Sequence, residues 1–324
     1  MKSTDLIKFL TRRARKDTPK AFISRLLRFG IILIYKALMN MWWNDLLYNL
    51  RGKGEYVISN IMGSEMQLAV NDGGISRDLL YNGIREPYAN KKLIRLLKPD
   101  DVVVEIGANI GYYALQEARI VKQVYAIEPT ATNVAQLRRN IALNGYQNIA
   151  VYEMAIGDYD GEATLYVTDA SNLCTLSKQS SHKHNKIVQV PIMTLDTFME
   201  NALYPSVIRM DVEGYEHEIV KGMSGILSQD KPLIIFMELH MDILGEKVVE
   251  LAEILRDNHF DIEYASCEPH PAVMKSPVGC GLTGSCDKQI GASQGYVVLT
   301  IDDLINKPIY SSGQVEWLEV IFRR

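Results

Sequence analysis

The sequence has few cysteines and no long uninterrupted apolar run. Four cysteines in 324 residues do not indicate a disulfide framework, so we expect a reducing compartment and a cytoplasmic protein. The apolar stretch from Phe29 to Met41 is interrupted by Lys36 and is shorter than the roughly 20 residues that span a bilayer. No signal-peptide pattern with a small-residue cleavage site is present. The composition therefore favours a globular protein.

Two glycine motifs of phosphate-binding loops are also missing. The Gly-Lys-Ser/Thr of a P-loop is absent. The stretch Glu105-x-Gly107-x-Asn109-x-Gly111 lacks the third glycine of the dinucleotide fingerprint G-x-G-x-x-G. The glycine spacing therefore argues against a pyrophosphate ligand and disfavours an NAD-type oxidoreductase.

Positive charge is scarce outside the first residues. Met1 to Gly54 carries 12 Lys/Arg against 3 Asp/Glu, a net charge of +9, whereas the whole chain carries −4. The remainder therefore carries −13, and a surface of that sign would repel nucleic-acid phosphates. We expect an acidic body without a nucleic-acid partner.

The basic segment 1–54 is predicted to be a helical extension of the body, which we place at 55–324. Its basic face and Trp42-Trp43 fit an amphipathic segment at a membrane interface, on the inner membrane face. A helical cap packed on the body or on a second copy of the chain explains the same pattern. Both interpretations stay open, and with them a peripheral membrane contact and a homo-oligomer.

The first positive signal in the sequence is a predicted strand followed by a glycine turn and a helix. Val102 to Ile106 is β-branched and apolar around Glu105, which is typical of a buried parallel strand. Helical spacing follows from Tyr112 to Val121. The turn between them brings backbone N–H groups and a helix N-terminus close to a ligand.

A second acid, Glu128, indicates which kind of ligand this turn would bind. Glu128 ends the next predicted strand, 17 residues after Gly111, where a carboxylate accepts hydrogen bonds from two ribose hydroxyls. The ligand should therefore have a ribose, no pyrophosphate and a cationic end to meet Glu105. S-adenosylmethionine has these features, so we expect it as the cofactor.

Strands and helices alternate along most of the chain, which predicts an α/β fold with a parallel sheet and right-handed crossovers. Thr130 or Thr132 is expected to cap the helix after Glu128. The polar segment 168–185 is long for a compact domain, so it is interpreted as either a mobile loop or a substrate lid. Besides a hairpin at 55–70, strands are expected at 102–106, 124–127, 149–154, 162–167, 186–193, 207–210, 233–237, 260–265 and 296–301, and helices at 76–97, 112–121, 130–143, 214–223 and 248–258.

Seven stretches of the chain form one ordered set of motifs. They are 104–113, 126–129, 140–144, 155–158, 194–196, 209–216 (with Asp211-Val212-Glu213-Gly214) and 238–240. In this order, the motifs resemble the FkbM family of S-adenosylmethionine-dependent methyltransferases. The resemblance covers about 81–240, the core of the predicted domain. It departs mildly at Glu105, where the family often has Asp, and at Arg209, where it often has Lys.

The resemblance implies a Rossmann-like class I methyltransferase fold, with a seven-stranded sheet whose last strand is antiparallel and helices on both faces. It also implies O-methylation of a hydroxyl on a sugar, glycan or glycosylated metabolite. The expected cofactor residues are Gly107, Asn109 and Gly111 on the methionine side, Glu105 at the amino group, Glu128 at the ribose, and Ala155 and Ile156 beside adenine.

The acceptor side offers candidates at other predicted strand ends. Asp211 is the first candidate for a general base or for positioning the hydroxyl, followed by Glu213 and His240. Alternatively, Asp211 caps the next helix, and Glu213 only binds backbone amides of the turn. Asp211, Glu213 and Glu238 also suit a divalent cation. The sequence does not require one, so no metal ligand is assigned.

Two further interpretations remain. Cys267, His270, Cys280 and Cys286 are zinc-type ligands, but their spacing matches no common zinc pattern. A different class of function is a non-catalytic scaffold that kept the fold and binds a partner or a membrane through residues 1–54. Calorimetry with S-adenosylmethionine separates this scaffold from the enzyme.

Overall fold

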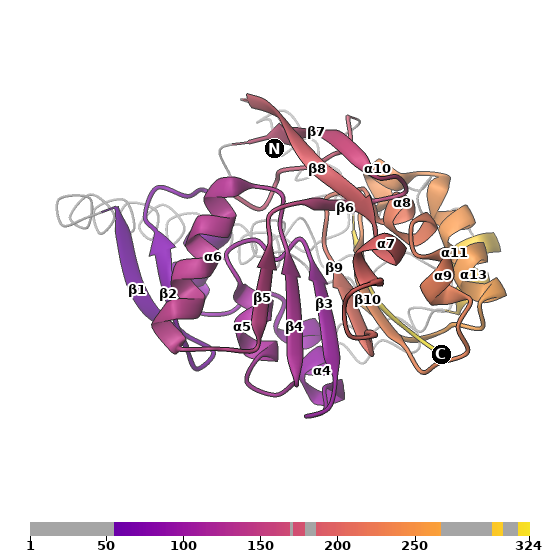
Figure 1. Ribbon diagram of the computed structural model, residues 1–324, viewed down its shortest axis with the longest axis horizontal. Coiled ribbons are helices and arrows are strands. Elements are labelled where there is room, and N and C mark those ends of the chain that lie inside the picture. The colour runs from indigo at the N-terminus through magenta and orange to yellow at the C-terminus, as the bar shows by residue number, and fades with distance from the viewer. Residues whose placement is uncertain (1–54, 169–170, 179–185, 267–299, 307–316) are drawn as a thin grey trace, which may run out of the picture. The chain divides into compact units, whose positions relative to one another are not determined.

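The computed structural model describes residues 55–168, 171–178, 186–266, 300–306 and 317–324 (Figure 1). The predicted helical extension at 1–54 lies outside the described residues. So do the four zinc-type residues between 267 and 286 and part of the predicted lid. Within the described ranges, no helix is both long enough and apolar enough to cross a bilayer.

Seven strands form one sheet in the order β11-β12-β10-β9-β3-β4-β5. All of them run parallel except β12, which is antiparallel to both of its neighbours. The predicted seven-stranded, mainly parallel sheet is therefore confirmed. The strands are β3 Val102–Ile106, β4 Gln123–Ile127, β5 Ile149–Tyr152, β9 Val207–Met210, β10 Ile234–Leu239, β11 Asp261–Ser266 and β12 Leu318–Arg323.

The alternation of side chains along the strands produces two apolar layers. Val104 and Ile208 belong to one hydrophobic cluster, and Val103 and Val207 belong to the other. Because helices pack on both clusters, the strands are buried on both faces, as their continuous apolar runs predict. The first cluster is covered by α7 Leu195–Met199, α8 Glu216–Lys221, α9 Ser224–Leu227, α10 Met241–Leu244, α11 Lys247–Asp257 and α13 Ile301–Asn306, and the second by α3 Ile75–Asn82, α4 Pro87–Leu96, α5 Tyr112–Glu117 and α6 Ala131–Asn144.

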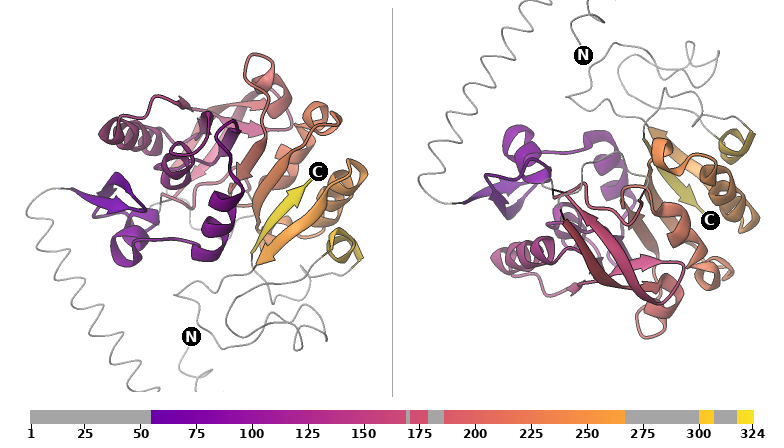
Figure 2. Two further views of the ribbon diagram at one scale, coloured as in Figure 1. Left: turned by 90° about the horizontal axis from the view of Figure 1, so that it is seen from below. Right: turned by 90° about the horizontal axis from the view of Figure 1, so that it is seen from above.

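A hairpin and a small sheet complete the described part. The predicted hairpin is confirmed as β1 Tyr56–Ile61 and β2 Ser64–Ala69, and it lies at the opposite end of the structure from β11 and β12 (Figure 2). The small sheet has the order β6-β8-β7 and lies beyond the upper ends of β3, β4 and β5 in Figure 1. Its strands are β6 Ala155–Gly157, β7 Gly161–Val167 and β8 Lys186–Thr194.

Three local expectations need correction. Thr130 is the N-cap residue of α6, but its side chain makes no capping hydrogen bond. The strand predicted at 296–301 lies mostly outside the described residues, and Ile301 begins helix α13. The N–H of Asp303 donates to Thr300 Oγ1 over 3.2 Å and the N–H of Thr300 donates to Asp303 Oδ2 over 2.9 Å, so a capping box starts a helix there. Strand Leu318–Arg323 was not predicted.

Candidate active site

One pocket lies at the carboxyl ends of the central strands, where a parallel sheet binds its ligands. It holds about 850 Å³ of space, including its open mouth, and the small sheet and residues 171–176 form part of its wall. Gly111 and His240 are not among its lining residues. The predicted residues that do line it are Glu105, Gly107, Asn109, Glu128, Ala155, Ile156, Asp211 and Glu213.

The glycine loop requires its glycines for two different reasons. Gly107 has φ +80°, and a Cβ there would lie 2.2 Å from the backbone oxygen of Asp211. Gly111 has φ +95°, and its Cβ would lie 2.6 Å from a methyl of Leu137 in α6. Gly107 thus lets the loop approach the opposite wall of the pocket, whereas Gly111 lets α6 pack against the start of α5.

The carboxylate of Glu128 is buried and held in place by its neighbours. Its Oε2 accepts the backbone N–H of Asn109 over 3.0 Å, and its Oε1 accepts the N–H of Thr130 over 2.9 Å. Asn133 Nδ2 donates to Oε1 over 3.2 Å. Burial raises the pKa of Glu128 above its ordinary value despite these donors. These three donors use three of the four lone pairs of the carboxylate, so Oε2 can still accept one hydrogen bond from a ligand.

Glu105 is bound to Arg209 deep in the pocket. The two residues are opposite partners in the β3–β9 register, so their side chains leave the sheet on the same face. Arg209 Nη1 donates to Glu105 Oε1 over 2.6 Å, and both side chains are buried. The guanidinium also stacks on the ring of Tyr113 at 3.6 Å. A ligand amino group would therefore have to share Glu105 with an internal cation.

A second buried acid lies next to this pair. Glu117 in α5 is fully buried, and burial together with the charge of Glu105 raises its pKa well above the ordinary value. Burial also raises the pKa of Glu105, to about 7, although Arg209 opposes this shift. Because the ion pair with Arg209 favours the charged form of Glu105, we infer that Glu117 is the protonated acid of the two.

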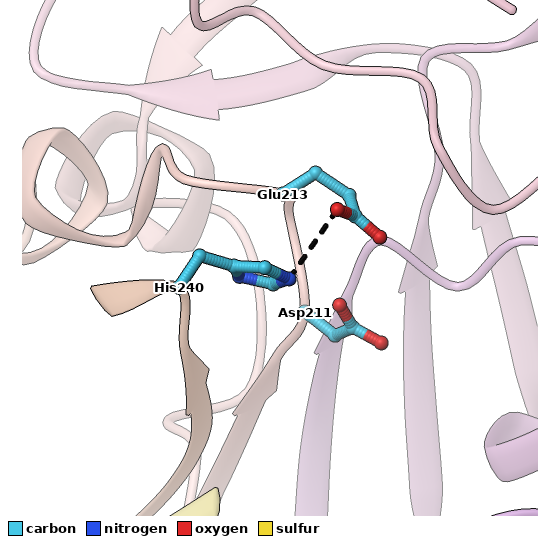
Figure 3. Close-up of side chains that lie close together, drawn as sticks. All are labelled: Asp211, Glu213 and His240. Carbon is cyan, nitrogen blue, oxygen red and sulfur yellow. Dashed lines mark ion pairs between the residues drawn. The ribbon is translucent and has the colours of Figure 1, made fainter. Parts of the chain in front are cut away.

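Asp211 and Glu213 line the acceptor side of the pocket, and with His240, which contacts Glu213 but does not line the pocket, they form a cluster. One ligand-type atom from each lies within 4.8 Å of the others, and Figure 3 shows the three side chains converging. His240 Nε2 is 3.3 Å from Glu213 Oε2, while His240 Nδ1 is 2.8 Å from Glu216 Oε1. This group contains His240 and not Glu238, the residue that the cation alternative placed with the two acids.

The Asp-Val-Glu-Gly block forms the turn that positions this cluster. Glu213 has the unusual φ of +54°, and a Cβ on Gly214 would lie 2.4 Å from Ile243. Helix α8 has Tyr215 as its N-cap residue, so Asp211 does not cap it and that alternative is wrong. The backbone N–H of Gly214 donates to Glu216 Oε1 over 3.1 Å, so this amide of the turn is bound by Glu216 and not by Glu213.

The charges of the cluster depend on each other. Burial raises the pKa of Glu213 to about 7, although His240 opposes the shift. Burial lowers the pKa of His240, but the carboxylates of Glu213 and Glu216 raise it by more, so it ends well above the ordinary value. The two carboxylates therefore favour the charged form of the His240 imidazole.

Sequence reasoning missed several residues that build the pocket. Ser171 donates its hydroxyl to Asp72 over 2.7 Å, and its backbone oxygen accepts from Asn109 and Asn133. Arg85 was also missed, although it lines the pocket. The register of strands β3 and β9 could have identified the pairing of Glu105 with Arg209. No local pattern indicates the contacts of Asp72 and Ser171, because they are far apart in the sequence.

A comparison with protein families finds a match that includes most of the residues of this pocket. The model of the methyltransferase FkbM domain matches residues 105–262, the stretch that carries both the glycine loop and the Asp-Val-Glu-Gly turn. This stretch is a methyltransferase FkbM domain. For residues 105–262 the predicted family is confirmed, and with it the predicted class I methyltransferase fold and the predicted cofactor, S-adenosylmethionine.

Curated relatives match shorter parts of the chain. The chain is 40% identical over 72 residues to a protein-L-isoaspartate O-methyltransferase of Methanoregula boonei, over 22% of this chain and 33% of that protein. It is 25% identical over 176 residues to the hexuronic acid methyltransferase AglP of Haloferax volcanii, over 52% of this chain and 70% of that protein. The first of these matches thus spans a third of its relative.

Solved structures resemble the chain at low sequence identity. The crystal structure of methyltransferase FkbM from Methylobacillus flagellatus is 20% identical, with a TM-score of 0.34, over 49% of this chain and 38% of that chain. A structure of Methanocaldococcus jannaschii TYW2 in complex with AdoMet is 14% identical, with a TM-score of 0.41, over 83% of this chain and 85% of that chain.

Proposed function

We propose that the protein is an S-adenosylmethionine-dependent O-methyltransferase that acts on a hydroxyl of a sugar, glycan or glycosylated metabolite. One observation carries this proposal: a single pocket has the fixed carboxylate of Glu128 on one side and the carboxylates of Asp211 and Glu213 on the other. The partial identity to a hexuronic acid methyltransferase supports a sugar acceptor.

The donor side has the groups that S-adenosylmethionine requires. Glu128 would accept a hydrogen bond from the ribose diol through Oε2, and the backbone of Gly107 leaves room for the methionine part. Ala155 and Ile156 offer apolar surface to adenine. When bound, the sulfonium supplies an activated methyl group, so the protein mainly has to align the acceptor and exclude water.

On the acceptor side, Asp211 would receive the hydroxyl proton. Its side chain is 22% exposed and is therefore open to a substrate, and Arg209 Nη2 lies 3.6 Å from its Oδ2. During transfer the methyl–sulfur bond breaks and its electron pair stays on sulfur. The acceptor oxygen forms the new bond to the methyl carbon, and its proton moves to the carboxylate.

A pair of variants tests this assignment. Glu128→Gln should lower the affinity for S-adenosylmethionine about tenfold or more in calorimetry, because a charged acceptor is lost. Asp211→Asn should bind the donor normally and transfer no methyl group. Absence of donor binding to the unmodified chain would refute the enzyme and leave the scaffold alternative.

The acceptor can be found by incubating the protein with labelled S-adenosylmethionine and glycan extracts. A methyl group on a sugar hydroxyl is an ether that resists mild base, whereas a methyl group on a uronic acid carboxylate is an ester that mild base removes. Label retained on a sugar after base treatment would support the proposal. Label lost on base treatment, or found on protein or RNA, would refute it.

We also keep the proposal that residues 1–54 bring the enzyme to a membrane surface, on the cytoplasmic side. Its charge of +9 supports attraction to anionic lipids. Deletion of 1–52 should abolish co-sedimentation with anionic vesicles. Unchanged co-sedimentation would exclude this role and favour packing on the body or on a second copy.

A further inference from the structure

We propose that Asp211, Glu213 and His240 form a binding site for a divalent cation on the acceptor side of the pocket. Two carboxylates and an imidazole are ligands that Mn²⁺, Fe²⁺ and Zn²⁺ accept. Their ligand atoms all lie within 4.8 Å of one another. Ligands of one such ion lie roughly 3 to 4 Å apart at the usual bond lengths, so small side-chain movements suffice.

The orientation of His240 is an independent observation that points to a ligand. The residue is 7% exposed, and Glu216, which is fully buried, holds its Nδ1 at 2.8 Å. The other nitrogen, Nε2, is thereby directed at the two acids of the cluster (Figure 3). Metal-binding histidines are typically held in this way, by a carboxylate on the nitrogen that does not bind the metal.

The charges around the cluster support the same inference. Arg209 lies 3.6 Å from Asp211, but its shortest contact is the 2.6 Å pair with Glu105. The carboxylates of Glu216 and Glu238 also lie close enough to affect the charges of Glu213 and His240. Negative side chains around the cluster therefore outnumber the arginines. A bound divalent cation would offset this excess of negative charge and hold His240 as a neutral ligand.

This inference rests on the proposed function and adds a substrate class to it. An ion with three protein ligands keeps open positions, which two neighbouring oxygens of the acceptor could fill. Vicinal diols and hydroxy-carboxylates of sugars present such pairs. A hydroxyl on a cation is a stronger acid and loses its proton to water more easily. Asp211 would then be a ligand rather than the base.

The test uses the full chain and Mn²⁺ alone, without methyl donor. Titration followed by electron paramagnetic resonance should show one bound Mn²⁺ per chain. Asp211→Asn and His240→Asn should each weaken Mn²⁺ binding at least tenfold while keeping the affinity for S-adenosylmethionine. Glu128→Gln is the matched control, because it should lose donor affinity and keep Mn²⁺. Circular dichroism of each variant checks that it is folded.

The outcomes separate this inference from the proposed function. No Mn²⁺ binding at millimolar concentration, or equal binding by Asp211→Asn, would overturn the cation site. If methyl transfer continues at an unchanged rate in EDTA, the cation's role in holding the acceptor is overturned while the methyltransferase stands. If Mn²⁺ binds as expected but the chain binds no S-adenosylmethionine, the cation site stands and the proposed function fails.

Discussion

The two halves of the pocket are built in different ways. On the donor half, Glu128 is held by the backbone N–H groups of Asn109 and Thr130 and by one amide side chain. On the acceptor half, Asp211, Glu213 and His240 are surrounded by other charged side chains. The donor half is fixed by backbone groups, so its geometry is rigid and can be predicted from a short motif. The geometry of the acceptor half depends on which of its side chains are charged and on which ions are bound.

The largest expected effect comes from removing the positive charge of Arg209, which lies beside Asp211 and Glu105. Arg209→Met would leave the buried Glu105 and nearby Asp211 without their partner and should lower the free energy of unfolding by about 3–5 kcal/mol. Urea unfolding measures this loss. Arg209→Lys keeps the charge and should lose clearly less, which also covers the case in which the Met variant fails to fold. Equal stability of Arg209→Met and the unmodified protein would contradict this account.

The next prediction concerns the point where the halves touch. Gly107→Ala places a Cβ against the backbone oxygen of Asp211, so it should cost about 1–3 kcal/mol beyond the strain of a left-handed residue. Gly145→Ala is the matched control, because Gly145 has φ +67° and nothing within 4 Å of its added Cβ. Thermal unfolding and calorimetry should show that only Gly107→Ala also weakens donor binding. Identical losses in the two variants would refute the close approach.

A smaller effect should follow from the protonation of Glu128. Burial raises its pKa above the ordinary 4.5, and the protonated carboxyl is a poorer acceptor for ribose hydroxyls. Affinity for S-adenosylmethionine should therefore fall as the pH is lowered toward this raised pKa, with a midpoint above 4.5. Calorimetry from pH 5 to 8 measures it. Glu128→Gln controls for titration of the ligand itself, and parallel curves for the two proteins would argue against a role of Glu128.

The smallest effect is expected at the second buried acid. Glu117→Gln replaces a protonated carboxyl with an amide that can still donate to Glu105, so the free energy of unfolding should change by no more than about 0.5 kcal/mol. Denaturation at pH 7 measures the change. A loss above about 2 kcal/mol would mean that Glu117 is charged and that the proton lies on Glu105.

The sequence predicted the donor half better than the acceptor half for a physical reason. Gly107 and Glu128 act through a local turn and a strand end, so their spacing carries the information. The contact of His240 with Glu216, and of Ser171 with Asp72, depends on the packing of segments distant in the sequence. The sheet was predicted up to β11 from apolar runs, whereas β12 was missed.

Strand β12 has a consequence for how the protein can be made. Its partners β10 and β11 are both complete by Ser266, yet β12 itself begins at Leu318 and inserts between them. During synthesis β11 has no strand partner in the described part of the chain until β12 leaves the ribosome, so two sheet edges stay open for that time. A truncated chain of residues 105–262 would lack β12, most of β11 and the start of β3, so the edge of β10 would stay open permanently. Expression of the matched domain alone should therefore yield aggregates, whereas a split chain could be rescued by adding the β12 segment as a separate peptide.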